Sequence, residues 1–321
     1  MSEKNRNILK KVFNTAYMIL KCKLPFTLFP NMLKLQIKNG SDIDGLSSYR
    51  TNTACRRFTQ YIVDDIREPL KDAINNARVF SVIYDGATDA SVTEVEIVYC
   101  RYVRDGKPLN CFVNLHEVEH AHAEGVFSAI DNAMVSAGIE NWKEKLVGTG
   151  SDGAKVNVGI SNSVATRMQG DGRHYQDIVD CTIDHISNRL SNSRDKARPV
   201  LEAARIFDVR DWPTTRTDLS PYGNQELDTL LQQLLPVLSR MGFDQSELKK
   251  EWIQLKAHVG NLLMRHPNRN QAPSLSTFFL TDDYRKKFHN ILMLVEIVFV
   301  LPMSSAVCER GFSAVNRIKS D

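Results

Sequence analysis

The chain has 321 residues, of which 42% are hydrophobic and 25% are charged, and its formal net charge is +3. This composition is ordinary for a globular chain that buries a core, and it excludes collagen-like, low-complexity and strongly disordered chains. A net charge this small produces no global attraction for nucleic acid, so any basic surface must be local.

Three features bear on the cellular setting. Six scattered cysteines without a CxxC pair favour reduced thiols over a disulfide framework. The first residues, MSEKNRNILKK, contain no apolar signal-peptide core. The longest apolar run, ILMLVEIVFVL from Ile291, is shorter than a bilayer requires and contains Glu296. We therefore expect a soluble intracellular protein that has no membrane partner.

Residues 1–75 have the pattern of a helical segment. Apolar residues recur at helical spacing from Ile8 to Leu20 and again from Phe58 to Leu70. Prolines 25 and 30 and the turn-rich sequence NGSDIDG at 39–45 lie between these two stretches, where we expect a loop.

The period then changes to that of β-strands. The runs FSVIYDG (80–86), EVEIVYCRYV (94–103) and LNCFVNLHEV (109–118) are rich in β-formers, and an Asp-Gly turn separates the last two. We expect three consecutive antiparallel strands, followed by a helix over about 123–137, a fourth strand over 145–154 and a helix near 158–168. This order predicts an α/β fold with a ribonuclease-H-like core, a mixed sheet flanked by helices, over residues 76–190.

Prolines mark the next segment as a connector. Pro199, Pro213 and Pro221 prevent a long helix between 191 and 224, where basic and acidic residues alternate. This alternation favours a solvated, mixed-charge segment over a phosphate-binding surface. Helical spacing returns over 225–264, and we expect C-terminal helices throughout 225–321.

Three carboxylates form a candidate metal site: Asp85, Asp152 and Glu309. In a ribonuclease-H-like sheet the first and fourth strands are neighbours, so the two aspartates would lie together, and a glutamate on a late helix could join them. Polynucleotidyl-transfer sites hold two divalent ions about 4 Å apart, and Mg²⁺ prefers carboxylate and water oxygens. The alternative reading is two Asp-Gly turns and a surface glutamate near a helix start.

Six segments resemble the hAT family of transposases, in its branch of domesticated, transposase-derived proteins. They lie in order over nearly the whole chain: AYMILKCKLPF, FSVIYDGATDASVTEVEIVYCRYV, LVGTGSDGAKVNVG, EAARIFDVRDWP, EWIQLKAHV and LPMSSAVCERGFSAVNRIKS. The last is similar to the dimerisation signature of the family. The resemblance implies that Asp85, Asp152 and Glu309 are the catalytic and metal-binding residues. It also implies Mg²⁺ or Mn²⁺ if the chain is catalytic, and otherwise no cofactor.

The chain departs from the family pattern in four places. No Cys/His cluster with zinc-ligand spacing lies at its start. The C-x-x-H motif of the family appears as Cys181 to His185, one residue too long, and the alternative there is a helix with a partly buried cysteine. The large helical insertion domain is mostly absent, with only the connector 191–224 in its place. The dimerisation motif is truncated at Asp321.

These observations leave three readings open. We favour a nuclear, transposase-derived protein, with a cytoplasmic fraction allowed, that forms a homodimer or heterodimer through its C-terminal motif and associates with DNA. This protein would be catalytically inactive and would have no small-molecule substrate. The second reading is an active, metal-dependent DDE-type DNA nuclease or strand transferase. The third is a truncated fragment that folds poorly.

Overall fold

A computed structural model describes residues 2–43, 45, 47–88, 93–118, 122–152, 164, 167–168, 179–183, 197–265, 274–302 and 305–319. The chain divides into two compact units. The first unit comprises Met1–Asp72, Thr88–Val92 and Glu309–Asp321, and the second comprises Ala73–Ala87 and Thr93–Cys308.

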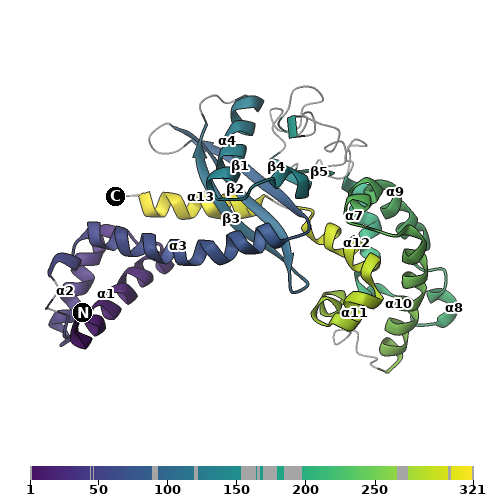
Figure 1. Ribbon diagram of the computed structural model, residues 1–321, viewed down its shortest axis with the longest axis horizontal. Helices are drawn as coiled ribbons and strands as arrows, with labels where there is room; N and C mark the ends of the chain where they lie inside the picture. Colours follow the sequence, from purple (N-terminus) through teal and green to yellow (C-terminus); the bar gives the residue numbers. More distant parts are fainter. Residues whose placement is uncertain are drawn as a thin grey trace. The chain divides into compact units, whose positions relative to one another are not determined.

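The N-terminal part of the first unit contains α1 (Glu3–Cys22), α2 (Phe29–Lys38) and most of α3 (Asn52–Asn76) (Figure 1). Their apolar faces share one core, in which the Phe58 ring lies 4.3 Å from that of Phe13 and 6.4 Å from that of Phe29, centroid to centroid. The loop expected between two helices is therefore partly helical. Pro30 lies in the first turn of α2, where its missing N–H leaves no intrahelical hydrogen bond unmade.

The second unit contains a five-stranded mixed sheet of order β3-β2-β1-β4-β5. Its strands are β1 (Phe80–Thr88), β2 (Glu94–Arg104), β3 (Lys107–Glu117), β4 (Leu146–Asp152) and β5 (Val179–Ile183). β2 and β3 pair antiparallel through a turn at Asp105 and Gly106, both with positive φ, whereas β4 pairs parallel with β1 and with β5. The predicted α/β fold with a mixed sheet flanked by helices is confirmed.

Two local expectations around the sheet have different outcomes. The helix expected over 123–137 is present as α4 (Ala123–Ser136), which packs on β2 and β3. Cys181 lies on β5, so the alternative of a helix there is wrong: the residues around it pair with β4. The helix expected near 158–168 lies mostly outside the described residues.

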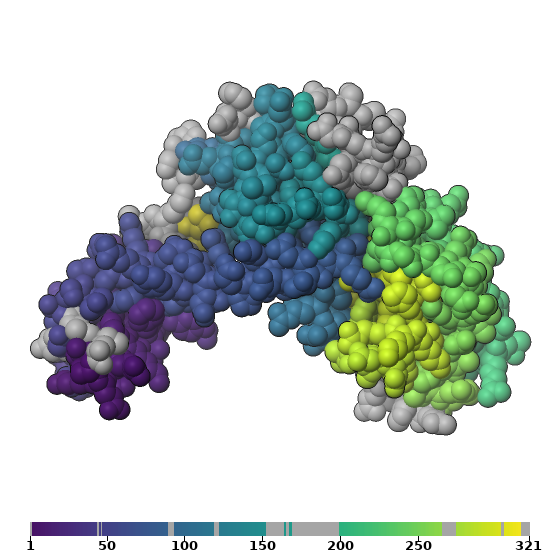
Figure 2. All heavy atoms as spheres, in the orientation of Figure 1, coloured from purple at the N-terminus to yellow at the C-terminus, as the bar shows by residue number. Residues whose placement is uncertain are grey.

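Helices fill the remainder of the second unit. They are α7 (Ala197–Ala203), α8 (Arg216–Leu219), α9 (Asn224–Arg240), α10 (Gln245–Arg265), α11 (Asp282–Lys287) and α12 (His289–Val300), and α13 (Ala306–Lys319) begins in this unit. Figure 2 shows the side chains from α7 to α12, green to yellow, packed into one continuous mass. No helix among the described residues combines the length and apolar character needed to cross a membrane.

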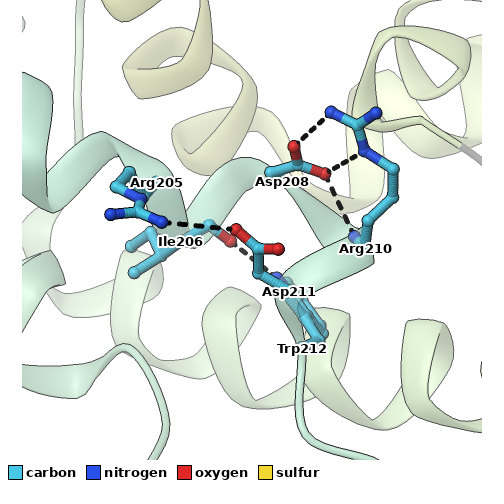
Figure 3. Close-up of polar contacts among 6 residues, drawn as sticks. All are labelled: Arg205, Ile206, Asp208, Arg210, Asp211 and Trp212. Atoms are coloured by element: carbon cyan, nitrogen blue, oxygen red, sulfur yellow. Dashed lines mark hydrogen bonds and ion pairs between the residues drawn. The ribbon is translucent and has the colours of Figure 1, made fainter.

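Part of the segment expected as a connector belongs to this core. Prolines keep its helices short, but Ile206 and Trp212 are buried, and the Trp212 indole donates a 2.7 Å hydrogen bond to the carbonyl of Ile206 (Figure 3). Asp208 pairs with Arg210, whose side-chain hydrogen bond lowers the pKa of Asp208. The buried residues of this segment follow neither the helical nor the strand period, so the sequence pattern did not predict that they belong to the core.

The helix α12 is the centre of the second unit, because every residue from Asn290 to Ile297 is buried. The buried carboxylate of Glu251 accepts hydrogen bonds at its start, from the backbone N–H of Ile291 at 2.9 Å and the side-chain amide of Asn290 at 2.7 Å. At its end, Arg101 of β2 donates to the carbonyl of Phe299 at 2.9 Å. An acid at the N-terminus and a guanidinium at the C-terminus both favour the helix dipole.

A second buried carboxylate connects α12 to the start of the sheet. Glu296 pairs with Arg78, two residues before β1 begins. Burial raises the pKa of Glu296, and the nearby Arg78 guanidinium offsets part of that effect. The pair therefore joins α12 to the segment before β1, with its carboxylate buried and its guanidinium exposed.

We predict that Glu251→Gln destabilises the second unit by about 1–3 kcal/mol, because a neutral amide replaces a charged acceptor opposite buried N–H donors. Glu247→Gln is the matched control on the same helix, since Glu247 forms only an exposed ion pair with Lys250. All three tryptophans of the chain, Trp142, Trp212 and Trp252, lie in this unit, so urea unfolding followed by their fluorescence reports on it. Equal unfolding midpoints for the two variants would contradict the role of Glu251.

Candidate functional site

Strand β1 passes from the core to the surface, and Asp85 lies where it first becomes partly exposed. Residues Phe80 to Tyr84 are all buried, and Asp85 is the first partly exposed residue of the strand. A strand with an uninterrupted buried run is one whose two faces are both covered. Asp85 therefore lies at the point where the sheet meets solvent.

The pairing of β1 with β4 determines what lies beside Asp85. The two strands run parallel, with Val82 opposite Thr149 and Ile83 opposite Gly150. Two residues further along each strand are Asp85 and Asp152. Paired strands are about 4.8 Å apart, so the backbone brings these two positions side by side at the same edge of the sheet. The side chain of Asp152 lies outside the described part of the structure.

Glu309 belongs to another part of the molecule. It lies in the first turn of α13 and is exposed. It is assigned to the first unit, whereas Asp85 and Asp152 are assigned to the second. Among the described side chains, no group of three His, Cys, Asp or Glu residues is close enough to hold a metal ion. The three-carboxylate site therefore stays a prediction.

The structure adds one acidic residue that the sequence reasoning missed. Glu96 on β2 is only 3% exposed, and its Oε2 would lie 3.2 Å from a Cβ atom added to Gly86. Residue 86, directly after Asp85, thus needs to be small to leave room for this carboxylate. The sequence does show a glutamate within the β-rich run EVEIVY. Strand alternation alone would have placed this glutamate on the solvent face of the sheet.

The histidines near the β3–α4 junction have a structural role. The Nδ1 atom of His122 accepts a 3.2 Å hydrogen bond from the backbone N–H of Gly125, which makes His122 the N-cap of α4. His116 lies on β3 opposite Glu96, and His120 is outside the described residues. His122 therefore lies at a helix start and caps it.

The donor set at the sheet edge suits a divalent ion. Carboxylate oxygens are the ligands that Mg²⁺ and Mn²⁺ prefer, and Asp85 and Asp152 would supply them from two rigid strands. Such an ion, when bound, would supply positive charge to phosphate oxygens.

A comparison with protein families gives one match. Residues 47–162 match the family DUF4371, described as the ZMYM1/FAM200 RNase-like domain, which is a domesticated family related to the hAT transposases. The match covers about a third of the chain, from the start of α3 through β4, and includes both Asp85 and Asp152. It agrees with the RNase-like arrangement of the sheet. It does not include the C-terminal segment, so the dimerisation motif stays a prediction.

We expect Mn²⁺ to bind the wild-type chain, and Asp85→Asn and Asp152→Asn each to weaken binding at least tenfold, because each removes one anionic ligand. Isothermal titration calorimetry measures this directly. Asp105→Asn is the control, because Asp105 lies in the β2–β3 turn with a positive φ that asparagine tolerates. Identical titrations for the wild type and all three variants would show that Asp85 and Asp152 do not bind the metal ion.

Proposed function

We propose that this chain is a transposase-derived nuclear protein that works by dimerising and by associating with DNA, and that it does not catalyse strand transfer. The match to a domesticated, transposase-related RNase-like family supports the ancestry. The observation that carries the proposed activity is the concentration of positive charge on the first two helices.

Residues 2–43 contain eight basic and two acidic residues, although the whole chain has a net charge of only +3. Seven of the basic side chains are exposed on α1 and α2: Lys4, Arg6, Lys10, Lys11, Lys21, Lys34 and Lys38. Within the described residues, one of them, Lys4, forms an ion pair, at 3.7 Å with the exposed Asp42. Exposed, mostly unpaired lysines and arginines of this density are typical of a surface that binds the phosphate backbone without reading sequence.

The proposed dimerisation rests on α13. Cys308, Phe312 and Val315 recur at i, i+4 and i+7, so they share one face of the helix. Cys308 is buried, whereas Phe312 and Val315 are half-buried and leave apolar surface for a partner. Arg310 and Ser313 are exposed. An amphipathic helix with an incompletely covered apolar face is suited to association with a second chain.

A specific observation favours the second candidate, a metal-dependent nuclease: residues 85 and 152 occupy matching positions on paired strands. Nicking of supercoiled DNA in Mn²⁺ by the wild-type chain but not by Asp85→Asn would establish this second function.

We predict that Lys10→Glu/Lys11→Glu weakens binding to double-stranded DNA at least tenfold. The slope of log K against log salt concentration should decrease in magnitude by about two, because two phosphate contacts are lost. Fluorescence anisotropy across a salt series measures both. The matched control is Lys286→Glu/Lys287→Glu, which reverses an exposed lysine pair on α11. Equal loss in the two variants would show that total charge, not this surface, governs binding.

We also predict that the wild-type chain is a dimer at tens of micromolar and that Phe312→Asp is a monomer, because a carboxylate would be buried in the apolar interface. Sedimentation velocity measures the state. Ser313→Asp introduces the same charge on the exposed side of α13 and should leave the dimer intact, and circular dichroism verifies that both variants fold. A strictly monomeric wild-type chain would disprove the dimerisation proposal.

A further inference from the structure

A groove of about 780 Å³ opens in the second unit between α8, α9 and α10. One wall is the outward face of α10, and the other comes from residues of α8 and α9 such as Leu219 and Leu227. The groove is distant in sequence from the carboxylates of the sheet, from the basic helices and from α13. It therefore belongs to none of the functions proposed above.

The α10 wall carries a stripe of apolar residues that the core does not use. Ile253, Ala257, Gly260 and Met264 recur at i, i+4, i+7 and i+11, while Leu255, Val259 and Leu263 of the same helix are buried in the core. Trp252 is also buried, and it lines the groove. Ile253 is 64% exposed and Met264 is 51% exposed, so large apolar side chains stand at both ends of the stripe. Between them, the short side chain of the exposed Ala257 leaves a depression, whereas Gly260 is buried.

The close approach of α8 determines the depth of this depression. A Cβ atom added to Gly260 would lie 2.6 Å from a methyl group of Leu219, so no other residue fits there without displacement. The stripe spans eleven residues, which is about 16 Å along a helix. This length matches about three turns of a second helix packed against it.

The polar groups along the groove give it a positive character. Lys249 is neutralised by Asp228 at 3.1 Å. Lys256, which is 5% exposed, donates to the carbonyl of Ser220, to that of Tyr222 at 3.1 Å and to Asn224 Oδ1 at 2.9 Å, and none of these acceptors is charged. Arg216 is exposed at the rim and forms no ion pair with a described residue. Two cations therefore remain without a carboxylate partner in the described part of the chain.

We infer that this groove binds an amphipathic helix of a partner protein, one that combines an apolar face with acidic residues along its edge. The apolar residues of the partner occupy the depression between Ile253 and Met264, and its acidic residue pairs with Arg216 at the rim. A bound helix typically places its own apolar residues, spaced at i, i+4 and i+7, into an apolar groove of this kind. Charge complementarity selects an acidic helix over a basic one.

The test is a selection from a library of helical peptides displayed on phage, with the full chain as the target. We expect the selected peptides to combine apolar residues at i, i+4 and i+7 with glutamate or aspartate at the flanks. Ile253→Asp and Arg216→Glu should each weaken binding of the selected peptides at least tenfold. Arg216→Glu should also regain affinity for peptides in which lysine replaces the acidic residue.

Two control variants make the result specific to the groove. Leu280→Asp alters an apolar side chain that is 57% exposed elsewhere in the same unit, and Lys286→Glu reverses an exposed charge on α11. Both should bind the peptides as the wild type does. Selected peptides without acidic residues, or binding unchanged by Ile253→Asp, would overturn the inference. Self-association of the wild-type chain that Ile253→Asp abolishes would assign the groove to a second copy and would also overturn it.

Discussion

The second unit depends on the burial of α12 from Asn290 to Ile297. A helix that is apolar on all sides cannot remain at a surface, so it requires the sheet on one side and α10 and α11 on the other. The first N–H groups and the last carbonyl groups of a helix have no partner within the helix, so they need polar partners from elsewhere in the chain. Glu251 supplies an acceptor at the start and Arg101 a donor at the end. The Arg78–Glu296 pair then fixes the helix beside the beginning of β1.

This arrangement assigns different physical roles to the acidic residues. Glu251 and Glu296 are buried and hydrogen-bonded or paired, and they organise packing. Asp85 lies where a buried strand emerges, beside the matching position of β4, so its placement follows from parallel strand pairing. Glu309 is exposed on a helix that counts largely with the other unit. Sequence resemblance groups Asp85, Asp152 and Glu309 together, and the pairing of β1 with β4 accounts for the proximity of the first two positions.

The surfaces free for partners are likewise separated along the chain. Positive charge is concentrated on α1 and α2, partly covered apolar surface on α13, and an apolar groove with a cationic rim lies along α10. A folded chain tends to bury large apolar side chains. The exposed Ile253 and Met264 therefore indicate a binding surface, because they flank one depression instead of standing singly. In the functions proposed above, these surfaces would bring DNA, a second chain and a helical partner together.

The sequence by itself determined four of the five strands, because the runs of β-formers between residues 80 and 152 and the Asp-Gly turn are local signals. It also located the helices from 224 to 265 through their apolar spacing. The helical nature of α2, the buried role of Ile206 and Trp212, the strand at Cys181 and the buried position of Glu96 depended on tertiary structure. In each case the deciding force was a contact between residues distant in sequence. A helix start can accept a proline, an irregular segment can be buried by its neighbours, and a charged residue can be enclosed when a glycine on the next strand leaves space for it.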